Sequence, residues 1–555
     1  MNMNYQDLFN LAKQKLGFDF EANFEEPNDP AHGDFSTNAA LVNSKVLKSN
    51  PRNIAQTLVD KMNENDLSSY DVKEITIAGP GFINFSVTRD YYHKLLNNVI
   101  DSKEDFGKNE SGKGNRAIVE YVSANPTGLL HIGHGRNAAI GDTIANLYEW
   151  NGYEVTKEYY FNNAGNQMNN LGKSIYARYI QLTKDKSYPL PENAYHGEYI
   201  ITIAQDIVYQ KGSEAYPYYN DINDIDDDTL TELRKIGEEK NFESIKKTLI
   251  ALNVIQDEYY NEDSLYTSGK IDAVVEEFKQ KGLAYEKDGA IWLKLSEMGL
   301  DEDRVIIKSS GEPTYRLPDI AYHKEKFERG FDVIIDVFGS DHIATIPDVM
   351  AGVSTLGYDK DKIKVVIHQF VTVFNDGQQV KMSKRTGKSY TLDDIIEEVG
   401  PEVTRFFFLM RSTGTHLEFD IKLAQEQNDK NPVFYLQYAH ARISSIIRMS
   451  KQKGIDFQYG SGDTTLLVHQ NEIELIKQLA KFEYVVSSAA DKCETNIVTD
   501  YLRDTAAKFH AFYHDCKVIS SDKELSKARL DLSYATSLVI KNGLRILGIS
   551  APEKM

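Results

Sequence analysis

The spacing of apolar residues changes character several times along the chain. Helical spacing occurs in three early segments: 5–12, 54–62 and 91–100. Two short β-like runs, 75–77 and 82–87, are separated by the turn sequence Gly79-Pro80-Gly81. This pattern predicts a small α+β domain over residues 1–110, with a polar, glycine-rich linker at its end.

A second pattern follows the linker. An apolar β run at 117–122 leads into a loop with Asn125, Pro126 and Gly128, then a helix over 134–150 and another β run at 154–160. Strand, loop, helix and strand make a βαβ unit, which is typical of the first half of a mononucleotide-binding domain.

The rest of the chain predicts two further regions. A Tyr- and Asp-rich stretch, about 170–300, favours a helical insertion, and β signals return at 305–308, 333–338 and 365–373. We therefore expect a catalytic-type domain over 111–429 and, because the pattern is helical from Asn431-Pro432 onward, a helical domain over 430–555. The expected fold class is an α/β Rossmann-type core with a small N-terminal α+β domain and an all-α C-terminal domain.

Composition narrows the setting. The 555 residues are 41% hydrophobic and 26% charged, and no apolar run approaches the ~18 residues that would cross a membrane. Only Cys493 and Cys516 occur, which excludes a disulfide framework and a four-thiolate zinc site. We expect a cytoplasmic protein with no membrane association and no zinc.

The net charge of −20 argues against nucleic acid as a partner, but the charge is unevenly distributed. From residue 430 onward, 17 basic and 14 acidic residues give +3, so the remainder carries −23. Either the last domain meets a polyanion through local basic patches, or it simply has fewer surface acids. Charge alone leaves both readings open.

The loop after the first parallel β run contains His131-Ile132-Gly133-His134-Gly135. Two histidines three apart at a helix start share one face, where they can donate hydrogen bonds to a phosphate beside the helix amino terminus. Glycines between them would let a nucleotide approach the backbone. Taken alone, the motif could equally be a satisfied pair of polar histidines.

A second loop favours the interpretation of the histidine motif as a phosphate-binding site. Lys381-Met382-Ser383-Lys384-Arg385 carries three cations in five residues, between a β run and a helix that begins near Leu392. By itself it could be a solvated basic turn. Beside a second nucleotide-binding half, it suits a loop that closes on a triphosphate.

The two loops together resemble the signatures of the class I aminoacyl-tRNA synthetases. Several further segments, which extend the resemblance over essentially the whole chain, are similar to arginyl-tRNA synthetases: 27–39, 79–85, 124–134, 162–167, 436–442 and 552–555. The resemblance implies an elbow-contacting amino-terminal domain, a Rossmann core and a helical anticodon-binding domain.

Other members of the class fit less well. Enzymes for valine, isoleucine and leucine need a large editing domain, because a missing methyl group is worth only ~1–3 kcal/mol. The interval from His131 to Lys381 is tight for one. A cysteinyl enzyme would want zinc thiolates in the core, and a glutamyl-type enzyme would carry its histidine loop near the amino terminus.

The resemblance implies roles for individual residues. For ATP it implies His131 and His134 at the α-phosphate, Lys381 and Lys384 at the pyrophosphate, and Gly133, Gly135, Asp341, Met382 and Ser383 around the nucleotide. For arginine it implies Tyr315 and Asp319 at the guanidinium and Ser123 and Asn125 at the amino acid end, with Glu120 and His342 as further candidates. Asp319 could instead cap a helix, and Glu120 could be a surface acid at a strand end.

For tRNA, the predicted helix after Pro432 places His440, Arg448 and Lys451 on its polar face, and the resemblance adds Arg442. Tyr435 and Tyr438 could stack on bases, although their helical spacing also suits a core.

The implied reaction has two steps. Arginine and ATP give arginyl-adenylate and pyrophosphate, and arginine then passes to the 2′-hydroxyl of the terminal adenosine of tRNA. Mg²⁺ would be carried mainly by ATP phosphates. No obligatory protein partner is expected, and a monomer is favoured.

The resemblance also implies that activation waits for bound tRNA. Lys384 departs from the many arginyl enzymes that lack this second lysine, so the sequence leaves the strictness of that dependence open. The rival hypothesis is an inactive synthetase-like regulator that binds tRNA or arginine.

Overall fold

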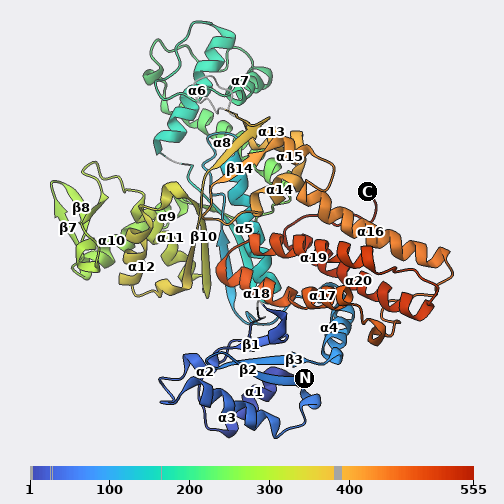
Figure 1. The fold of residues 1–555 in the computed structure, drawn as a ribbon. Coiled ribbons are helices and arrows are strands. Elements are labelled where there is room, and N and C mark those ends of the chain that lie inside the picture. The colour runs from blue at the N-terminus through green and yellow to red at the C-terminus, as the bar shows by residue number, and fades with distance from the viewer. Residues whose placement is uncertain (1–3, 26, 28, 164, 381–389) are drawn as a thin grey trace. The chain divides into compact units, whose positions relative to one another are not determined.

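The computed structural model describes residues 4–25, 27, 29–163, 165–380 and 390–555, and these form two compact units. The first unit contains Met1–Phe106, Arg442–Lys481 and Ala507–Leu538, and the second contains Gly107–Ala441, Phe482–Ala506 and Val539–Met555. Three of the five boundaries between the units fall inside long helices, which Figure 1 labels: α16 (Pro432–Gln452), α19 (Asn496–Asp515) and α20 (Lys523–Ile546).

The amino-terminal part of the first unit is the predicted small α+β fold. Its antiparallel sheet has the order β1-β3-β2 and consists of β1 (Phe35–Thr37), β2 (Val72–Ala78) and β3 (Phe82–Val87). Its helices are α1 (Tyr5–Lys15), α2 (Ala39–Val42), α3 (Pro51–Asn63) and α4 (Arg89–Ser102). The apolar faces read from the sequence are the buried ones, including Leu8 of α1 and Leu58 of α3. The rest of the first unit includes α17 (Gln470–Ala480), which packs against α4.

The centre of the second unit is a parallel sheet of the order β11-β10-β4-β5-β6. Its strands are β4 (Arg116–Glu120), β5 (Glu154–Phe161), β6 (Glu258–Asn261), β10 (Val333–Gly339) and β11 (Ile363–His368). Ile334 pairs with Ile118 on one side and Ile363 on the other. Residues 117–119 are fully buried, as expected for a parallel strand covered on both faces.

Helices cover both faces of this sheet. On one face α10 (Lys270–Gln280), α11 (Arg316–Glu328) and α12 (Ile346–Thr355) form a core with Ile118 and Ile334. On the other, α5 (Ile132–Trp150) lies against β4, β5 and β10 and is covered by α14 (Pro401–Leu409) and α18 (Phe482–Lys492). Chain order reverses between β4 and β10, so the carboxyl ends of these strands open a crevice of the kind that binds nucleotides.

The stretch expected to be a helical insertion contains strands as well as helices. Its helices include α6 (Gly165–Thr183), α7 (Glu198–Lys211), α8 (Asp227–Ala251) and the short α9 (Asp263–Thr267). Strand β6 belongs to the central sheet, whereas β7 (Ala284–Lys287), β8 (Ala290–Leu293) and β9 (Arg304–Ile307) form a separate antiparallel sheet. The predicted strand at 305–308 is therefore real but lies outside the central sheet.

A third small sheet, of the order β13-β12-β14, follows β11. It consists of β12 (Val371–Asn375), β13 (Gln378–Gln379) and β14 (Leu417–Asp420), with α13 (Leu392–Val399) and α15 (Ile421–Gln425) nearby in the chain. The eight 3₁₀ segments in the described residues are Pro30–His32, Leu67–Tyr70, Lys103–Asp105, Ile222–Asp224, Leu295–Met298, Ser340–His342, Lys360–Lys362 and Thr464–Leu466. As predicted, the described structure after residue 430 is helical. Across the described segments, no helix has the length and apolar character needed to span a membrane.

Candidate active site

The loop that leaves β4 is fixed at the crevice by a buried amide. Oδ1 of Asn137, on α5, accepts the Val122 amide (2.6 Å), and its Nδ2 donates to the Val337 carbonyl at the end of β10 (2.8 Å). Val122 and Ser123 have φ values of 69° and 44°, a left-handed conformation that a β-branched residue rarely adopts. One side chain thus ties together both strands at the crevice and a strained turn.

His131 and His134 form a reciprocal cap at the start of α5. Nδ1 of His131 accepts the amides of Gly133 (3.1 Å) and His134 (3.3 Å), and Nδ1 of His134 accepts the His131 amide (3.2 Å). The rings stack with centroids 3.6 Å apart. The two histidines take the places that Ser or Thr and Glu occupy in an ordinary capping box.

This cap fixes the proton positions of both rings. Because each Nδ1 accepts a backbone hydrogen, a neutral ring carries its proton on Nε2. Burial, with smaller contributions from His131 and His368, lowers the pKa of His134 to about 3, so His134 is neutral near pH 7. The site therefore has ring N–H donors beside a helix amino terminus, an arrangement suited to phosphate oxygens.

The two glycines of this motif have different surroundings. A Cβ on Gly135 would lie 2.5 Å from Leu392 and 2.9 Å from Phe408, so Gly135 allows α5 to pack closely against α13 and α14. Among the described residues, a Cβ on Gly133 would meet only the His131 ring, at 2.9 Å. The surroundings of Gly133 are therefore less crowded than those of Gly135.

Glu120 is a buried acid rather than a surface acid at a strand end. It is 4% exposed, accepts the Ser123 hydroxyl (2.9 Å), and pairs with the buried Nζ of Lys326 (2.6 Å). Lys326 also pairs with Asp336 (2.6 Å), whose other oxygen lies 2.9 Å from Nε2 of His323. Despite the burial of Lys326, the surrounding carboxylates raise its pKa. This network connects β4, β10 and α11 beneath the crevice.

Asp319 lies in the first turn of α11 and makes no capping hydrogen bond. Burial, together with the nearby Glu120 and Glu262, raises the pKa of Asp319 to about 7, while His323 and Lys326 act in the opposite direction. Glu262 follows β6, is 7% exposed, and accepts the hydroxyls of Tyr160 (2.8 Å) and Tyr266 (3.2 Å). Burial raises the pKa of Glu262 as well. An environment of acids whose pKa values are raised favours a cationic ligand.

The sequence did not point to Glu262, Lys326 or Asp336. Glu262 follows a strand that has no apolar run, and Lys326 lies on a helix where a charged residue predicts exposure. The only available signal was position, because acids at the carboxyl ends of parallel strands gather at one edge of a sheet.

Asn125 follows the strained turn in the chain, whereas Glu120 precedes it. Its Oδ1 accepts the Asn162 amide (3.2 Å), and its Nδ2 donates to Oε1 of Gln167 (3.0 Å). The segment 162–167, which the sequence also singled out, therefore contacts the histidine loop.

Three predicted residues are more exposed. Tyr315 is 76% exposed, just before α11. Asp341 and His342 lie in a short 3₁₀ turn after β10, and the His342 ring stacks on Phe338 with centroids 5.2 Å apart. Asp341 and His342 thus lie just after the carboxyl end of a central strand.

Lys381, Met382, Ser383, Lys384 and Arg385 lie outside the described residues. The segment that follows them is joined to the histidine loop: Thr391 forms a β-bridge with His131, and the Leu392 amide donates to the Leu130 carbonyl (2.9 Å). Thr391 and Leu392 are therefore anchored beside the histidine cap.

The predicted tRNA-binding residues on α16 have unlike environments. Tyr438 is 44% exposed and Arg448 is exposed, whereas Tyr435 is half-buried. Arg442 donates to the Tyr513 hydroxyl (2.8 Å). His440 is not on an exposed polar face: it is 6% exposed, and its Nδ1 donates to the Pro552 carbonyl (2.9 Å), because the carboxyl-terminal segment covers it. Burial lowers the pKa of His440.

Three family models match successive parts of the chain. They are the arginyl tRNA synthetase N terminal domain over residues 4–87, the tRNA synthetases class I (R) catalytic domain over 95–406, and the DALR anticodon binding domain over 436–555. Their order is that of the three predicted regions.

Relatives match over nearly the full length. The arginine–tRNA ligase of Salinibacter ruber is 47% identical over 97% of this chain and 96% of its own, and that of Desulfotalea psychrophila is 46% identical over 96% and 94%. The Thermus thermophilus arginyl-tRNA synthetase structure has the same fold, with a TM-score of 0.78, 22% identity and 99% coverage of both chains. On this evidence the chain belongs to the arginyl-tRNA synthetase family.

Proposed function

We propose that this protein is an arginine–tRNA ligase. The observation that carries the proposal is the presence, at one strand crevice, of a cap of two histidines, of which His134 is neutral, and of buried carboxyl groups of raised pKa at Asp319 and Glu262. The first suits a phosphate and the second suits a guanidinium. An arginine-activating enzyme needs both.

In the first step, an oxygen of the arginine carboxylate attacks the α-phosphorus of ATP. The new O–P bond forms as the bond to the bridging oxygen breaks, giving arginyl-adenylate and pyrophosphate. His131 and His134 would donate from Nε2 to the α-phosphate oxygens as negative charge develops there, with no proton transfer required. Lys381 and Lys384 are assigned to the departing pyrophosphate.

Recognition of arginine would fall to two acids. We assign the guanidinium to Asp319 and Glu262, because a planar fork of N–H donors matches carboxylates better than a point charge does. Glu120, oriented by Lys326 and Ser123, would receive the α-ammonium group, and Tyr315 would close over the bound side chain.

Among the described residues, no group of three or more His, Cys, Asp or Glu side chains is arranged to hold a metal ion. We propose that Mg²⁺ arrives on the phosphates of ATP, because this ion keeps its waters and usually binds through substrate phosphates. None of the residue roles assigned here depends on a protein-held metal.

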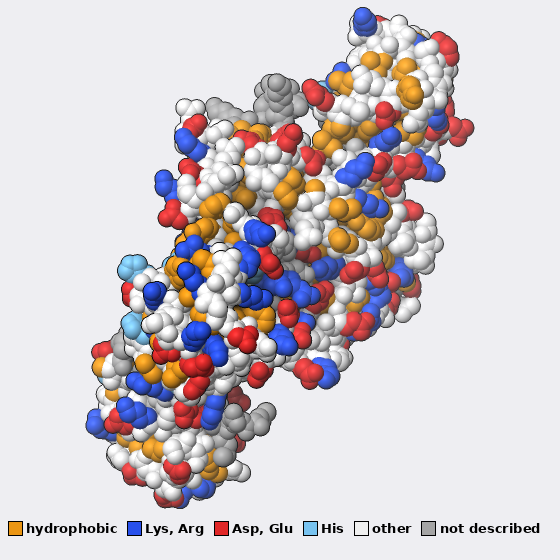
Figure 2. Space-filling view, turned by 90° about the vertical axis from the view of Figure 1, so that its right-hand side faces the viewer, with side chains coloured by type: hydrophobic (Ala, Val, Ile, Leu, Met, Phe, Trp, Pro, Cys, Tyr) orange, Lys and Arg blue, Asp and Glu red, His pale blue; other side chains and the backbone are white. Residues whose placement is uncertain are grey.

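In the second step, a ribose hydroxyl of the terminal adenosine attacks the carbonyl carbon of the adenylate. AMP leaves, and the hydroxyl proton passes to its phosphate. The helical domain would hold the anticodon, with Tyr438 and Arg448 as exposed contacts. Acidic and basic side chains are interspersed on the face shown in Figure 2, so cations are available locally despite the net charge of −20. We place the reaction in the cytoplasm and propose a monomer.

The deciding experiment is arginine-dependent ATP–pyrophosphate exchange with cognate tRNA, with lysine in place of arginine as the control. We expect exchange with arginine and none with lysine. Lys381→Ala should lower the rate of exchange ~10²–10³-fold and leave tRNA affinity nearly unchanged. An inactive regulator would bind tRNA or arginine but would not catalyse exchange. Binding without arginine-dependent exchange would therefore refute the proposal.

A further inference from the structure

Helix α8 contacts the loop that leads to the histidine motif and the helix that follows the lysine loop. Nδ2 of Asn241 donates to the Pro126 carbonyl in the histidine loop (3.0 Å). Farther along the helix, the Thr248 hydroxyl donates to Oδ1 of Asp393 (2.7 Å), in the first turn of α13 just after the lysine loop. One element of the insertion therefore joins two segments that are more than two hundred residues apart in sequence.

The spacing of these contacts follows from helical geometry. Seven residues make about two turns, so Asn241 and Thr248 share one face and are about 10 Å apart along the axis. They are 2% and 3% exposed. A buried polar group is costly unless it is hydrogen-bonded, so these two bonds specify what this face of α8 contacts.

The helix is held in place by other parts of the unit. Phe242 packs against Tyr159 and Phe161 of β5, with ring centroids 5.6 and 4.8 Å apart. At the carboxyl end, Nη1 of Arg405 donates to the carbonyls of Leu252 (3.2 Å) and Asn253 (3.1 Å). Because these contacts do not involve the signature loops, α8 can serve as a fixed reference for both.

We infer that Asn241 and Thr248 are positioning residues for arginine activation, an inference that rests on the proposed function. Asn241 sets the loop that carries Asn125 and so acts on arginine. Thr248 sets the start of α13, and through the bridge between Thr391 and His131 it acts on the phosphate end. The two contacts should therefore affect different kinetic constants.

For Thr248, the informative pair is Thr248→Val and Thr248→Ser. Valine keeps the shape and loses the hydroxyl, and serine keeps the hydroxyl. We expect Thr248→Val to lower kcat of exchange ~10-fold while the KM for arginine changes less than about 2-fold, because misplacement by a fraction of an ångström already slows reaction. Thr248→Ser should restore kcat to within about 2-fold.

Asp393→Ala tests the same bond from the other side and leaves α8 intact. It should lower kcat as Thr248→Val does. The double variant should be no slower than the slower single variant, because each single variant already removes the hydrogen bond between Thr248 and Asp393. Thr355→Val is the matched control: it removes a hydroxyl that donates to its own helix, to the Ala351 carbonyl (2.9 Å), and kcat should be unchanged.

For Asn241, the similar-sized Asn241→Leu should raise the KM for arginine ~10-fold, with a smaller change in the KM for ATP. Thermal melting of each variant shows whether it folds. If a variant of α8 does not fold, Asp393→Ala provides the test instead. Absence of arginine-dependent exchange in the unaltered protein would refute the proposed function. The inference fails separately if that protein is active and the folded variants keep kcat and KM, or if Thr248→Ser is as impaired as Thr248→Val.

Discussion

At the scale of single residues, Asp319 has the most testable electrostatics. Its pKa, raised to about 7 by burial and by the nearby acids, means that the free protein holds a proton on this group below neutrality. Under the proposed assignment of the guanidinium to Asp319, arginine binds the ionised form of this group, so arginine binding should release that proton. Arginine affinity should therefore fall as the pH drops from 8 to 6, while ATP affinity changes little; calorimetric titrations in buffers of different ionisation enthalpy would measure the proton release.

Asp319→Asn supplies the control for this pH dependence. The variant should bind arginine ~30-fold or more weakly, since truncating one side of a buried charge pair usually costs ~2–5 kcal/mol, and its remaining affinity should not vary with pH over this window. An unchanged pH profile in the variant would assign the titration to another group.

The same pKa predicts a change in stability. Between pH 4 and pH 7 the folded protein keeps a proton that the unfolded chain has lost, so Asp319 makes stability fall as the pH rises through this window. Asp319→Asn should remove this contribution and melt at a higher temperature than the parent at pH 8, with little difference at pH 4. The reverse order at pH 8 would mean that Asp319 is stabilised in its ionised form.

Residues of the site were predictable where the chain is contiguous and not where the fold assembles them. His131, His134 and Asn125 follow a recognisable strand, and the two histidines form the cap at the start of α5. Glu262 follows β6 and Lys326 lies on α11, and only the order of the strands in the sheet places these two elements near β4. His440 had the right spacing for an exposed face, but residues 552–555 were needed to show that it is covered.

At the scale of elements, α16 offers a test of RNA binding that leaves the core intact. Tyr438→Ala and Arg448→Ala change exposed side chains and should each weaken tRNA binding several-fold, with the KM for arginine in exchange unchanged. Stacking is worth ~1–3 kcal/mol per base, whereas a cation acts on phosphates, so only Arg448→Ala should flatten the salt dependence of binding, as measured by filter binding at several salt concentrations.

His440→Ala is the contrasting variant on the same helix. Since His440 is buried against Pro552, its loss should lower the melting temperature while the salt dependence of tRNA binding stays as in the parent. Equal loss of tRNA affinity in all three variants, without a change in melting temperature, would mean that His440 contacts tRNA rather than stabilising the fold.

Helices and strands whose apolar residues recur with a clear period were predicted well, and short elements were not. Helices α1, α3 and α5 and strands β3 and β5 match their apolar patterns because each buries one face or both. Strand β6 has the sequence Glu-Tyr-Tyr-Asn, which carries no apolar signal since it is a sheet edge. The predicted run at 305–308 has a clear apolar signal, but a short apolar run does not indicate which sheet it joins.

At the scale of the whole molecule, Arg405 secures the second unit. Fully buried, it donates to the carbonyls of Leu252, Asn253 and Leu547 and pairs with Asp142. Arg405→Leu should lower the free energy of unfolding by ~3–5 kcal/mol, because it leaves buried acceptors and a carboxylate without their partner. Both tryptophans, Trp150 and Trp292, belong to this unit, so tryptophan fluorescence during denaturation reports its unfolding alone.

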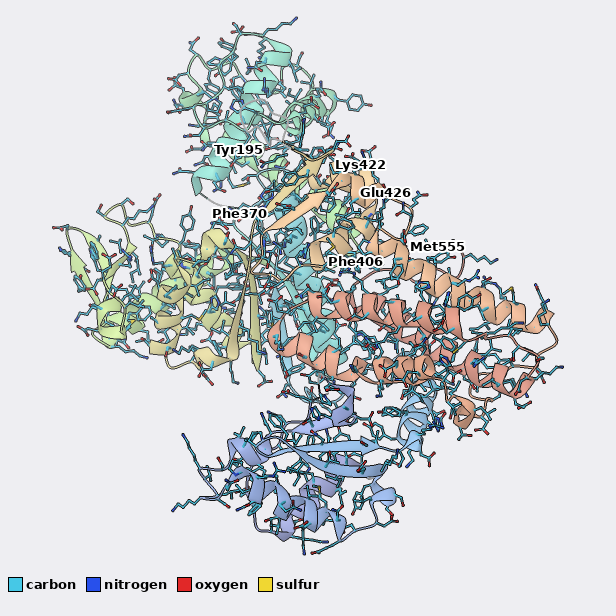
Figure 3. All side chains as sticks on the ribbon, viewed as in Figure 1. Tyr195, Phe370, Phe406, Lys422, Glu426 and Met555 are labelled. Carbon is cyan, nitrogen blue, oxygen red and sulfur yellow. The ribbon has the colours of Figure 1, made fainter. Side chains whose placement is uncertain are left out.

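Lys422→Ala is the matched control, on the same unit; Figure 3 labels Lys422 on α15. Lys422 pairs with Asp376 at 2.6 Å, but the two side chains are 67% and 72% exposed. Such pairs contribute ~0–1 kcal/mol, so the denaturation midpoint should barely move. Similar losses in both variants would mean that burial does not govern the strength of these ion pairs.

The strand order also has a consequence for synthesis of the protein on the ribosome. β4 and β5 leave the ribosome early, but β10, which covers the other edge of β4, follows roughly 210 residues later. At ~5–20 residues per second, that apolar edge remains open for ~10–40 s. The nascent chain must be protected from pairing with its neighbours during this interval, which makes slow translation or scarce chaperones a greater hazard for this fold than for one whose adjacent strands are made in succession.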